Sequence, residues 1–130
     1  MAIESIEAFL VGLPEIDDDH RLLVGTINRM GVEIEEASHK LCVELFAEFE
    51  TAATTHFARE EEILERLGYP EIERHRSYHA DLLRRVRELK SLGYEKVSKD
   101  ALFSRFVEMA DFVVDDIFRG DIEFKDFLHG

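Results

Sequence analysis

The chain has 130 residues, of which 45% are apolar and 35% are charged, and it contains only seven Gly and two Pro. That length suits a single domain with one core, and the scarcity of helix-breaking residues favours a helical domain over a many-stranded one. The formal net charge of −13 argues against a surface for nucleic acid or anionic membrane, because both are polyanions that attract Lys and Arg.

Residues 1–17 are predicted to form a non-helical arm, with Gly12 and Pro14 preventing a helix near its end. A first helix is predicted from about residue 18 to 37, because acidic residues at its start suit the positive end of a helix dipole. Apolar residues recur along it at the 3–4 spacing of one helical face, and His20 lies on that face.

A second helix is predicted from about residue 40 to 67, where Gly68 is a natural stop. His56 and Glu60 interrupt its apolar face. Because they are four residues apart, their side chains project in the same direction and can share one metal ion.

A third helix is predicted from about residue 70 to 92, beginning at Pro70, which a first helical turn tolerates. His75 and His79 interrupt its apolar face, again four residues apart. This second pair also projects from one side of its helix.

A fourth helix is predicted from about residue 99 to 119, with Asp116 on its apolar face and Asp121 near its end. Acidic side chains there meet the negative end of the helix dipole, which is unfavourable. A bound dication explains these acids better than chance surface placement. Asp115 is an alternative ligand if the helix is locally overwound.

These elements predict an all-α fold, an antiparallel up-down-up-down four-helix bundle with a non-helical N-terminal arm, because the connections between the helices are short. The whole chain, residues 1–130, is expected to form one domain.

Cys42 is the only cysteine, which excludes an intrachain disulfide and a zinc–thiolate cluster. Glu4 and Glu7 break up the apolar residues of an N-terminus that lacks basic residues, so no signal peptide is expected. No apolar run approaches the ~18 residues of a membrane-spanning helix. We therefore expect a soluble, cytoplasmic protein with no membrane partner.

Polar residues from all four predicted helices thus fall on faces that should be buried. They are His20, His56, Glu60, His75, His79, Asp116 and Asp121. Since an unpartnered buried charge costs several kcal/mol, convergence of this set predicts a bound cation. Imidazole and carboxylate without thiolate suit iron, manganese or zinc. Two divalent ions would bring the formal charge from −13 to about −9.

Each part of this pattern also has a simpler interpretation. A His-x-x-x-His pair alone is weak evidence for metal, and His56 with Glu60 could be one hydrogen-bonded core pair. His20 could be half exposed at its helix start. His39 and His129 are interpreted as surface histidines, not as ligands.

The motifs taken together resemble the hemerythrin family. The stretch Val11-Gly-Leu-Pro-Glu-Ile-Asp-Asp-Asp-His20 resembles its entry motif, which usually has Gln just before the histidine. His56-Phe-Ala-Arg-Glu60-Glu61 resembles the His-Phe-x-x-Glu-Glu segment, and His75-Arg-Ser-Tyr-His79 resembles the His-x-x-x-His segment. Order and separations agree from about Phe9 to Phe127.

The fourth motif departs from the family, which usually carries His-Ile-x-x-x-Asp on the last helix. This chain has Asp116-Ile-Phe-Arg-Gly-Asp121, so an aspartate replaces the fifth histidine. The resemblance implies two non-haem iron ions, with manganese or another divalent metal as the alternative. By the same resemblance one ion takes His75, His79 and Asp116, the other takes His20 and His56, and Glu60 and Asp121 bridge them.

The resemblance implies dioxygen, or a related small molecule, as the bound partner, for carriage, storage or sensing. Apolar residues are expected to line that pocket: Ile27, Phe49, Phe112, Val113 and Ile117. An added negative charge at Asp116 would stabilise the higher oxidation state of the metal. Two alternatives therefore stay open: an enzyme that reduces peroxide, oxygen or nitric oxide, and a metal store. The sequence points to no particular protein partner.

Overall fold

The computed structural model describes residues 14–114 and 119–129, and these residues form five helices and no strand. The helices are α1 (Pro14–Glu36), α2 (His39–Arg66), α3 (Ile72–Tyr94), α4 (Lys99–Phe112) and α5 (Arg119–His129). Within the described ranges, no helix is both long and apolar enough to span a bilayer. The expected all-helical architecture is therefore confirmed.

The first helix begins earlier than the sequence predicts. Pro14 is the first residue of α1, so Pro14 to Asp17 are helical and do not belong to a non-helical arm. A proline fits the first helical position because its fixed φ is already helical and its missing N–H has no partner to lose there. The rest of the predicted arm, residues 1–13, lies outside the described part of the chain.

The connection between α2 and α3 is closed by backbone hydrogen bonds. Tyr69 N–H donates to the carbonyl of Leu64 at 3.0 Å, and Gly68 N–H donates to that of Glu65 at 3.1 Å. Gly68 has a φ of +70°, the left-handed conformation that a helix C-terminus of this kind requires. α2 ends at Arg66, and the predicted stop residue Gly68 closes its C-terminus two residues later.

The end of α3 uses the same arrangement with a less suitable residue. Lys96 N–H donates to the Gly93 carbonyl at 3.1 Å and Val97 N–H to that of Leu92 at 3.3 Å. Lys96 has a φ of +57°, which is strained for a residue with a Cβ.

The described part of the fourth predicted helix falls in two elements, α4 and α5, and residues 115–118 between them lie outside the described part of the chain. The α-helix α4 ends at Phe112. Val113 and Val114, which follow it, have a wider π-helical pattern, and α5 begins at Arg119. Asp121 therefore lies in the first turn of a separate helix and not at the end of α4. That position is electrostatically favourable for a carboxylate, opposite to the expectation from sequence.

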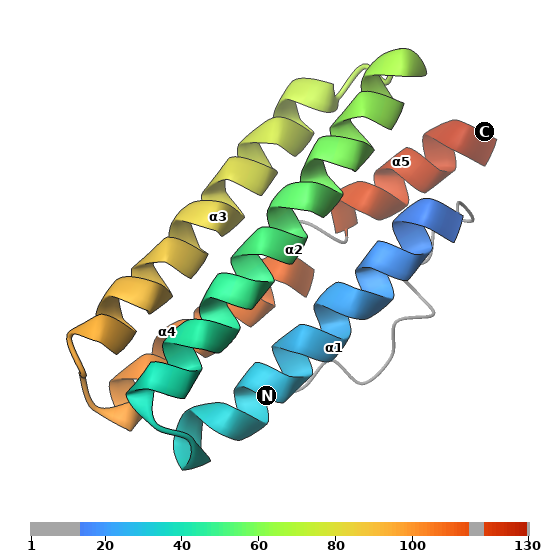
Figure 1. Ribbon diagram of the computed structural model, residues 1–130. Coiled ribbons are helices and arrows are strands. Elements are labelled where there is room, and N and C mark those ends of the chain that lie inside the picture. Colours follow the sequence, from blue (N-terminus) through green and yellow to red (C-terminus); the bar gives the residue numbers. More distant parts are fainter. Residues whose placement is uncertain (1–13, 115–118, 130) are drawn as a thin grey trace.

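The helices surround a common core (Figure 1). α2 packs on both α1 and α3, and α4 packs on the other side of α1 and α3. The chain reverses direction between α1 and α2 and again between α2 and α3, while α5 lies beside the N-terminal part of α1. At the opposite end, the Lys99 ammonium contacts the carbonyl oxygens of Ile34 and Ala37, which joins the start of α4 to the end of α1.

Two apolar clusters fill this core, and polar residues separate them. The larger includes Leu23 of α1 and Phe57 of α2, and the smaller includes Ile16 of α1 and Ile63 of α2. His20 follows Ile16 and precedes Leu23, while Glu60 follows Phe57 and precedes Ile63. The polar layer is thus covered by apolar side chains on both sides along these two helices.

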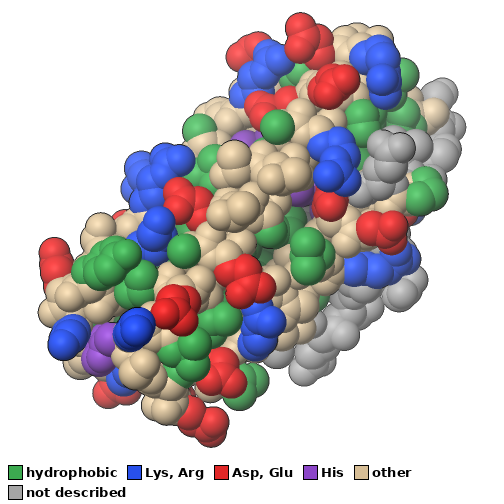
Figure 2. Space-filling view, in the orientation of Figure 1, with side chains coloured by type: hydrophobic (Ala, Val, Ile, Leu, Met, Phe, Trp, Pro, Cys, Tyr) green, Lys and Arg blue, Asp and Glu red, His purple; other side chains and the backbone are tan. Residues whose placement is uncertain are grey.

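The exposed face in Figure 2 carries acidic and basic side chains interspersed with one another. Surface charges also pair between helices, as Arg29 of α1 does with Glu48 of α2 at 2.7 Å. Exposed pairs of this kind contribute at most about 1 kcal/mol each to stability. The buried clusters therefore hold the helices together far more than the surface charges do.

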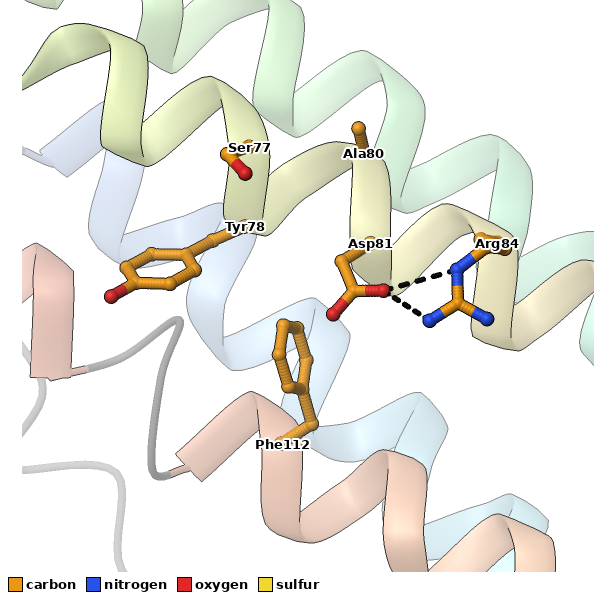
Figure 3. Close-up of a pocket in the computed structure, with 6 residues that line it drawn as sticks. All are labelled: Ser77, Tyr78, Ala80, Asp81, Arg84 and Phe112. Atoms are coloured by element: carbon orange, nitrogen blue, oxygen red, sulfur yellow. Dashed lines mark hydrogen bonds and ion pairs between the residues drawn. The ribbon is translucent and has the colours of Figure 1, made fainter.

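A surface pocket of about 450 Å³ lies between α3 and the end of α4, lined by Tyr78, Asp81, Arg84 and Phe112 among others (Figure 3). The Tyr78 and Phe112 rings meet edge to face across it, with centroids 6.4 Å apart. Phe112 borders this outer pocket and packs only partly against the core, which corrects its expected place in an inner lining. Ile27, Phe49 and Val113 are buried in the larger cluster, and Ile117 lies outside the described residues.

Candidate metal centre

Six of the seven predicted ligand residues are described, and all six are buried. Their side chains converge from α1, α2, α3 and α5, with 3% or less of each residue exposed: His20, His56, Glu60, His75, His79 and Asp121. The seventh, Asp116, and its alternative Asp115 lie outside the described residues. His39 is half-buried, with its Nε2 2.8 Å from the Val97 carbonyl, and the side chain of His129 is not described.

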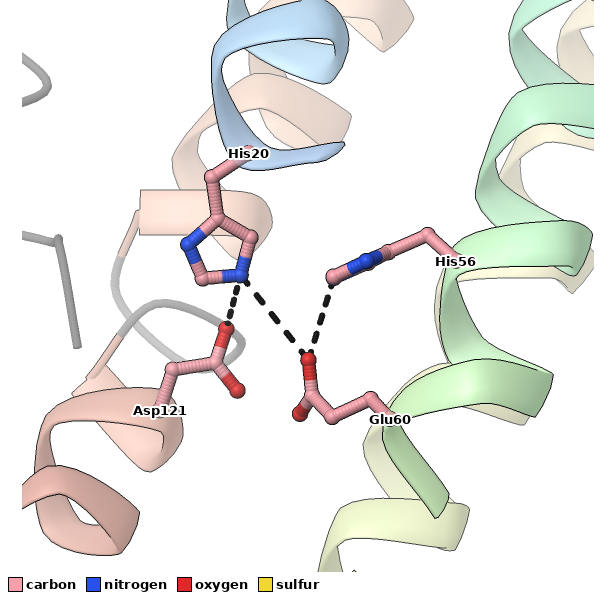
Figure 4. A group of neighbouring side chains, drawn as sticks. All are labelled: His20, His56, Glu60 and Asp121. Atoms are coloured by element: carbon pink, nitrogen blue, oxygen red, sulfur yellow. Dashed lines mark ion pairs between the residues drawn. The ribbon is translucent and has the colours of Figure 1, made fainter. Parts of the chain in front are cut away.

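A first group consists of His20, His56, Glu60 and Asp121 (Figure 4). Each offers one nitrogen or oxygen atom, and these four atoms all lie within 4.8 Å of one another. His20 Nε2 is 2.8 Å from Asp121 Oδ2, and His56 Nε2 is 3.0 Å from Glu60 Oε2. Two imidazoles and two carboxylates around one point form a donor set for a divalent cation.

A second group consists of Glu60, His75 and His79, whose donor atoms meet the same distance limit. His75 Nδ1 is 3.2 Å from Glu60 Oε1, and His79 Nε2 is 3.7 Å from the same oxygen. The described residues therefore give this group three donors, one fewer than the first group.

Glu60 belongs to both groups and divides its two oxygens between them. Oε2 faces His20 at 3.8 Å and His56 at 3.0 Å, whereas Oε1 faces His75 and His79. Asp121 is placed similarly, with Oδ2 at His20 and Oδ1 3.8 Å from His75 Nδ1. Two carboxylates each present one oxygen to either side, which is the geometry required to bridge two cations.

Several buried donor and acceptor atoms of these groups lack a hydrogen bond of regular geometry within the described chain. They include His56 Nε2, Glu60 Oε2 and both ring nitrogens of His79. Because buried polar side-chain atoms are nearly always satisfied, such a concentration needs an explanation. Cations coordinated by these atoms would satisfy them, so the donor set fits a pair of metal ions.

The pKa values of the cluster show that the site favours positive charge. Burial opposes protonation of His20, but its contacts with Asp121 and Glu60 outweigh that effect and raise its pKa to about 10. Burial likewise opposes charge on His75, yet Glu60 raises the pKa of that ring. Burial alone would raise the pKa of Glu60, but the four surrounding histidines hold it well below its usual range.

The second carboxylate behaves differently from Glu60. Burial first, and the negative charge of Glu60 next, raise the pKa of Asp121 to about 6. Two carboxylates in one buried site repel each other, so one of them tends to keep a proton unless a cation lies between them.

Neighbouring groups fix the histidine rings of the second group. The His79 ring stacks on Phe57 with centroids 3.8 Å apart and 3° between the planes. His75 Nε2 lies 3.0 Å from the carbonyl oxygen of Gly120, so its N–H donates there and Nδ1 is left facing Glu60. A Cβ at residue 120 would come within 3.3 Å of His75 Nε2, so the glycine permits this close approach.

Sequence reasoning missed Gly120 and also Asp19, whose carboxylate contacts His56 Nδ1 at 3.1 Å. Each contact joins two different helices, α1 with α2 for Asp19 and α3 with α5 for Gly120. No spacing rule within one helix could have revealed them, because the partners belong to different helices.

Comparison with known proteins agrees with this arrangement. The family model described as "Hemerythrin HHE cation binding domain" matches residues 11–127. A bacteriohemerythrin of Stenotrophomonas maltophilia is 30% identical over 80 residues, covering 62% of this chain and 52% of the relative. One of Pseudomonas aeruginosa is 30% identical over 79 residues, covering 61% and 52%.

A third relative, the bacteriohemerythrin of Clostridium acetobutylicum, is 25% identical over 115 residues, which cover 83% of this chain and 84% of that protein. The chain spans about half the length of the first two relatives. No solved structure matches it significantly. Since the family model covers all but the ends of the sequence, including every residue of both groups, the chain belongs to the hemerythrin family.

Proposed function

We propose that the buried cluster holds two metal ions, in the first instance iron, and that the pair binds dioxygen or a related small molecule. The observation that supports this most directly is the division of the Glu60 oxygens between two groups of histidines. A single buried ion pair would need one carboxylate oxygen, not two oxygens facing opposite histidine pairs. Manganese or another divalent metal suits the same donors.

The residue roles follow from the two groups. His20 and His56 would hold one ion and His75 and His79 the other, and Glu60 and Asp121 would each supply carboxylate oxygens to both. Asp116, which lies outside the described residues, would be the further ligand of the second group, for which the described residues supply three donors. The bound iron pair would supply the electrons that dioxygen takes up on binding.

The protein contributes a covered site and fixed ligands. Apolar clusters lie on either side of the polar layer and limit the entry of water and protons. Histidine rings held by Phe57 and Gly120 keep their donor nitrogens aimed at the carboxylates. Such positioning keeps the donor atoms close together before any ion binds.

The fold that we propose around this site is an antiparallel up-down-up-down bundle of α1 to α4, with α5 supplying Asp121. The neighbour relations of the helices and the chain reversals in Figure 1 support it. A single domain over residues 1–130 belongs to the same proposal, as does a cytoplasmic location.

The decisive experiment is the visible spectrum of anaerobically iron-loaded protein as air is admitted and then removed. An absorption band that appears with air and fades when air is removed would establish reversible binding for carriage, storage or sensing. Absence of bound iron, or a spectrum that does not respond to air, would refute the proposed function.

A redox enzyme or a metal store is the second candidate, favoured by the aspartate at position 116 where the family has histidine. An extra carboxylate stabilises the oxidised metal, so oxygen would be reduced and not released. Immediate and permanent oxidation in air, with steady consumption of added peroxide, would support the enzyme. Permanent oxidation without peroxide consumption would support storage.

A further inference from the structure

Asp19 lies at the surface end of a chain of contacts that leads into the buried cluster. It belongs to α1, and its side chain is 17% exposed, whereas His56 on α2 is 2% exposed. Asp19 Oδ2 is 3.1 Å from His56 Nδ1 and 3.0 Å from Arg59 Nη1. One carboxylate oxygen therefore accepts a hydrogen bond from a buried imidazole and forms an ion pair with a surface guanidinium.

This contact determines which nitrogen of His56 faces the cluster. A carboxylate only accepts hydrogen bonds, so the Nδ1 of His56 must carry the proton that it donates to Asp19. Nε2, which lies 3.0 Å from Glu60 Oε2, is then the nitrogen with a lone pair available to a cation. A carboxylate that accepts from the outer nitrogen of a metal-binding histidine fixes the ring and strengthens its donor nitrogen.

Arg59 fixes the other side of the Asp19 carboxylate. It lies three residues after His56 on α2, so both partners of Asp19 come from neighbouring turns of the same helix. Asp19 and Arg59 also border a groove between α1 and α2 that opens to solvent. The contact thus ties α1 to α2 at the level of the first group.

The preceding residue provides a natural comparison. Asp18 is 76% exposed, and its one ion pair among residues 14–114 and 119–129 is with Arg21 of its own helix, at 3.1 Å. It has the same charge and almost the same chain position as Asp19, but no described contact with the cluster. Replacement of Asp18 therefore controls for charge and for helix stability near the start of α1.

We propose that Asp19 is a positioning residue for the metal centre, which holds the His56 ring so that Nε2 faces the first group. The proposal rests on the proposed function, since it requires a metal ion between His20, His56, Glu60 and Asp121. It assigns Asp19 an effect on the first ion and none on the ion of the second group, which contains neither His56 nor a contact of Asp19.

Zinc is a suitable probe because it accepts the same ligands and is diamagnetic. Zinc would be titrated into the unmodified full chain and into three variants, Asp19→Ala, Asp19→Asn and Asp18→Ala. A colorimetric chelator that competes for zinc would report the affinity of each site. We expect Asp19→Ala to weaken one of two zinc sites by roughly tenfold to 100-fold and to leave the other unchanged. Asp19→Asn should recover most of that loss, because the amide oxygen accepts the same hydrogen bond. Asp18→Ala should bind zinc as the unmodified chain does.

NMR of the zinc-loaded protein gives a second measurement that does not depend on affinity. The Nδ1–H proton of His56 should be visible and slow to exchange with solvent in the unmodified chain and in Asp19→Asn. Its signal should be lost, or exchange rapidly, in Asp19→Ala. If the unmodified zinc-loaded chain shows no protected His56 Nδ1–H, the proposal is overturned even where a variant fails to fold.

The outcomes separate this proposal from the proposed function. Two zinc ions in the unmodified chain with unchanged affinities in Asp19→Ala would overturn the role of Asp19 and leave the metal centre intact. No zinc in the unmodified chain would overturn the metal centre, and the role of Asp19 with it. Equal weakening by Asp18→Ala would assign the effect to surface charge and would also overturn the role of Asp19.

Discussion

Replacement of Glu60 by Gln should abolish binding of both metal ions, because Glu60 is the only residue that belongs to both described groups. The amide is nearly isosteric with the carboxylate, but its NH₂ group cannot coordinate a cation, and the negative charge is lost. Whichever way the amide lies, one group faces its NH₂ and loses an oxygen donor, and the other group keeps only a neutral amide oxygen in place of a carboxylate. The residue is 1% exposed, so solvent cannot readily replace that oxygen.

The size of the effect can be estimated from linkage. At a free metal concentration roughly 100 times its Kd, each ion stabilises the folded chain by about 2.7 kcal/mol. For a domain of this length 1 kcal/mol corresponds to about 4 °C in Tm, so each ion raises Tm by about 10 °C. Two ions should raise it by about 20 °C in the unmodified chain, and Glu60→Gln should show almost no metal-dependent increase.

The assay is thermal unfolding with and without a chelator, together with metal stoichiometry after dialysis. Comparing each variant with its own chelated form removes any effect of the substitution on the metal-free fold. His56→Ala and His79→Ala each affect one group only, so each should keep one ion and about half of the Tm increase. Glu62→Gln, an exposed carboxylate on the same helix, is the matched control and should behave as the unmodified chain does.

Retention of two ions with an undiminished Tm increase in Glu60→Gln would refute the bridging role. Loss of both ions in His79→Ala or His56→Ala, with the metal-free fold intact, would also contradict the assignment of separate groups.

Four further outcomes are expected. Asp116→His should restore oxygen binding of the usual family type, seen in the visible spectrum, and unchanged metal content and oxygen chemistry would show that Asp116 is not a ligand. Gly93→Ala should lower the free energy of unfolding in urea by about 1–3 kcal/mol, because the new Cβ would lie 2.6 Å from Val43 Cγ2. Gly25→Ala, with no atom within 4 Å of the new Cβ, should raise it by about 0.5–1 kcal/mol, and equal effects at both sites would contradict the packing argument. Lys96→Gly should raise the free energy of unfolding by about 1 kcal/mol by relieving a φ of +57°, whereas Gly68→Ala should lower it by a similar amount. Lys90 and Arg87 hold the pKa of Glu50 below its usual 4.5, against the opposing effect of burial. The ion pairs of Glu50 therefore stabilise the folded chain above pH 4.5, and this contribution is lost as the pH falls through the lowered pKa. Glu50→Gln should therefore lower the free energy of unfolding in urea by about 1 kcal/mol at pH 7 and leave it unchanged at a pH below the lowered pKa. A decrease of the same size at both pH values would refute the role of these ion pairs.

The sequence alone was sufficient for features that depend on neighbours within one helix. The spacing of His56 and Glu60, and of His75 and His79, placed each pair on one buried face, and Gly68 marked the end of α2. Periodicity and stop residues are local properties, so the helical class and the main helix positions could be predicted. The motifs also carried the family resemblance that the family model then bore out.

Sequence rules for helix ends failed at two residues, Pro14 and Asp121, each of which is compatible with more than one position relative to a helix. Pro14 was interpreted as a helix breaker, but at the first helical position its ring costs nothing, and α1 begins there. Asp121 was assigned to the end of the fourth helix, whereas the structure has it in the first turn of α5. The sequence contains both alternatives, and contacts with the rest of the fold choose between them.

Only the tertiary structure decided how the buried groups face one another. The division of the Glu60 oxygens between two histidine pairs, the approach of the Gly120 carbonyl to His75 and the contact of Asp19 with His56 all join different helices. Such contacts depend on how the helices are rotated and shifted against one another, and that arrangement is set by packing of the whole core. The sequence by itself determined which residues are available to a metal centre, and the packed helices determined which of their atoms meet.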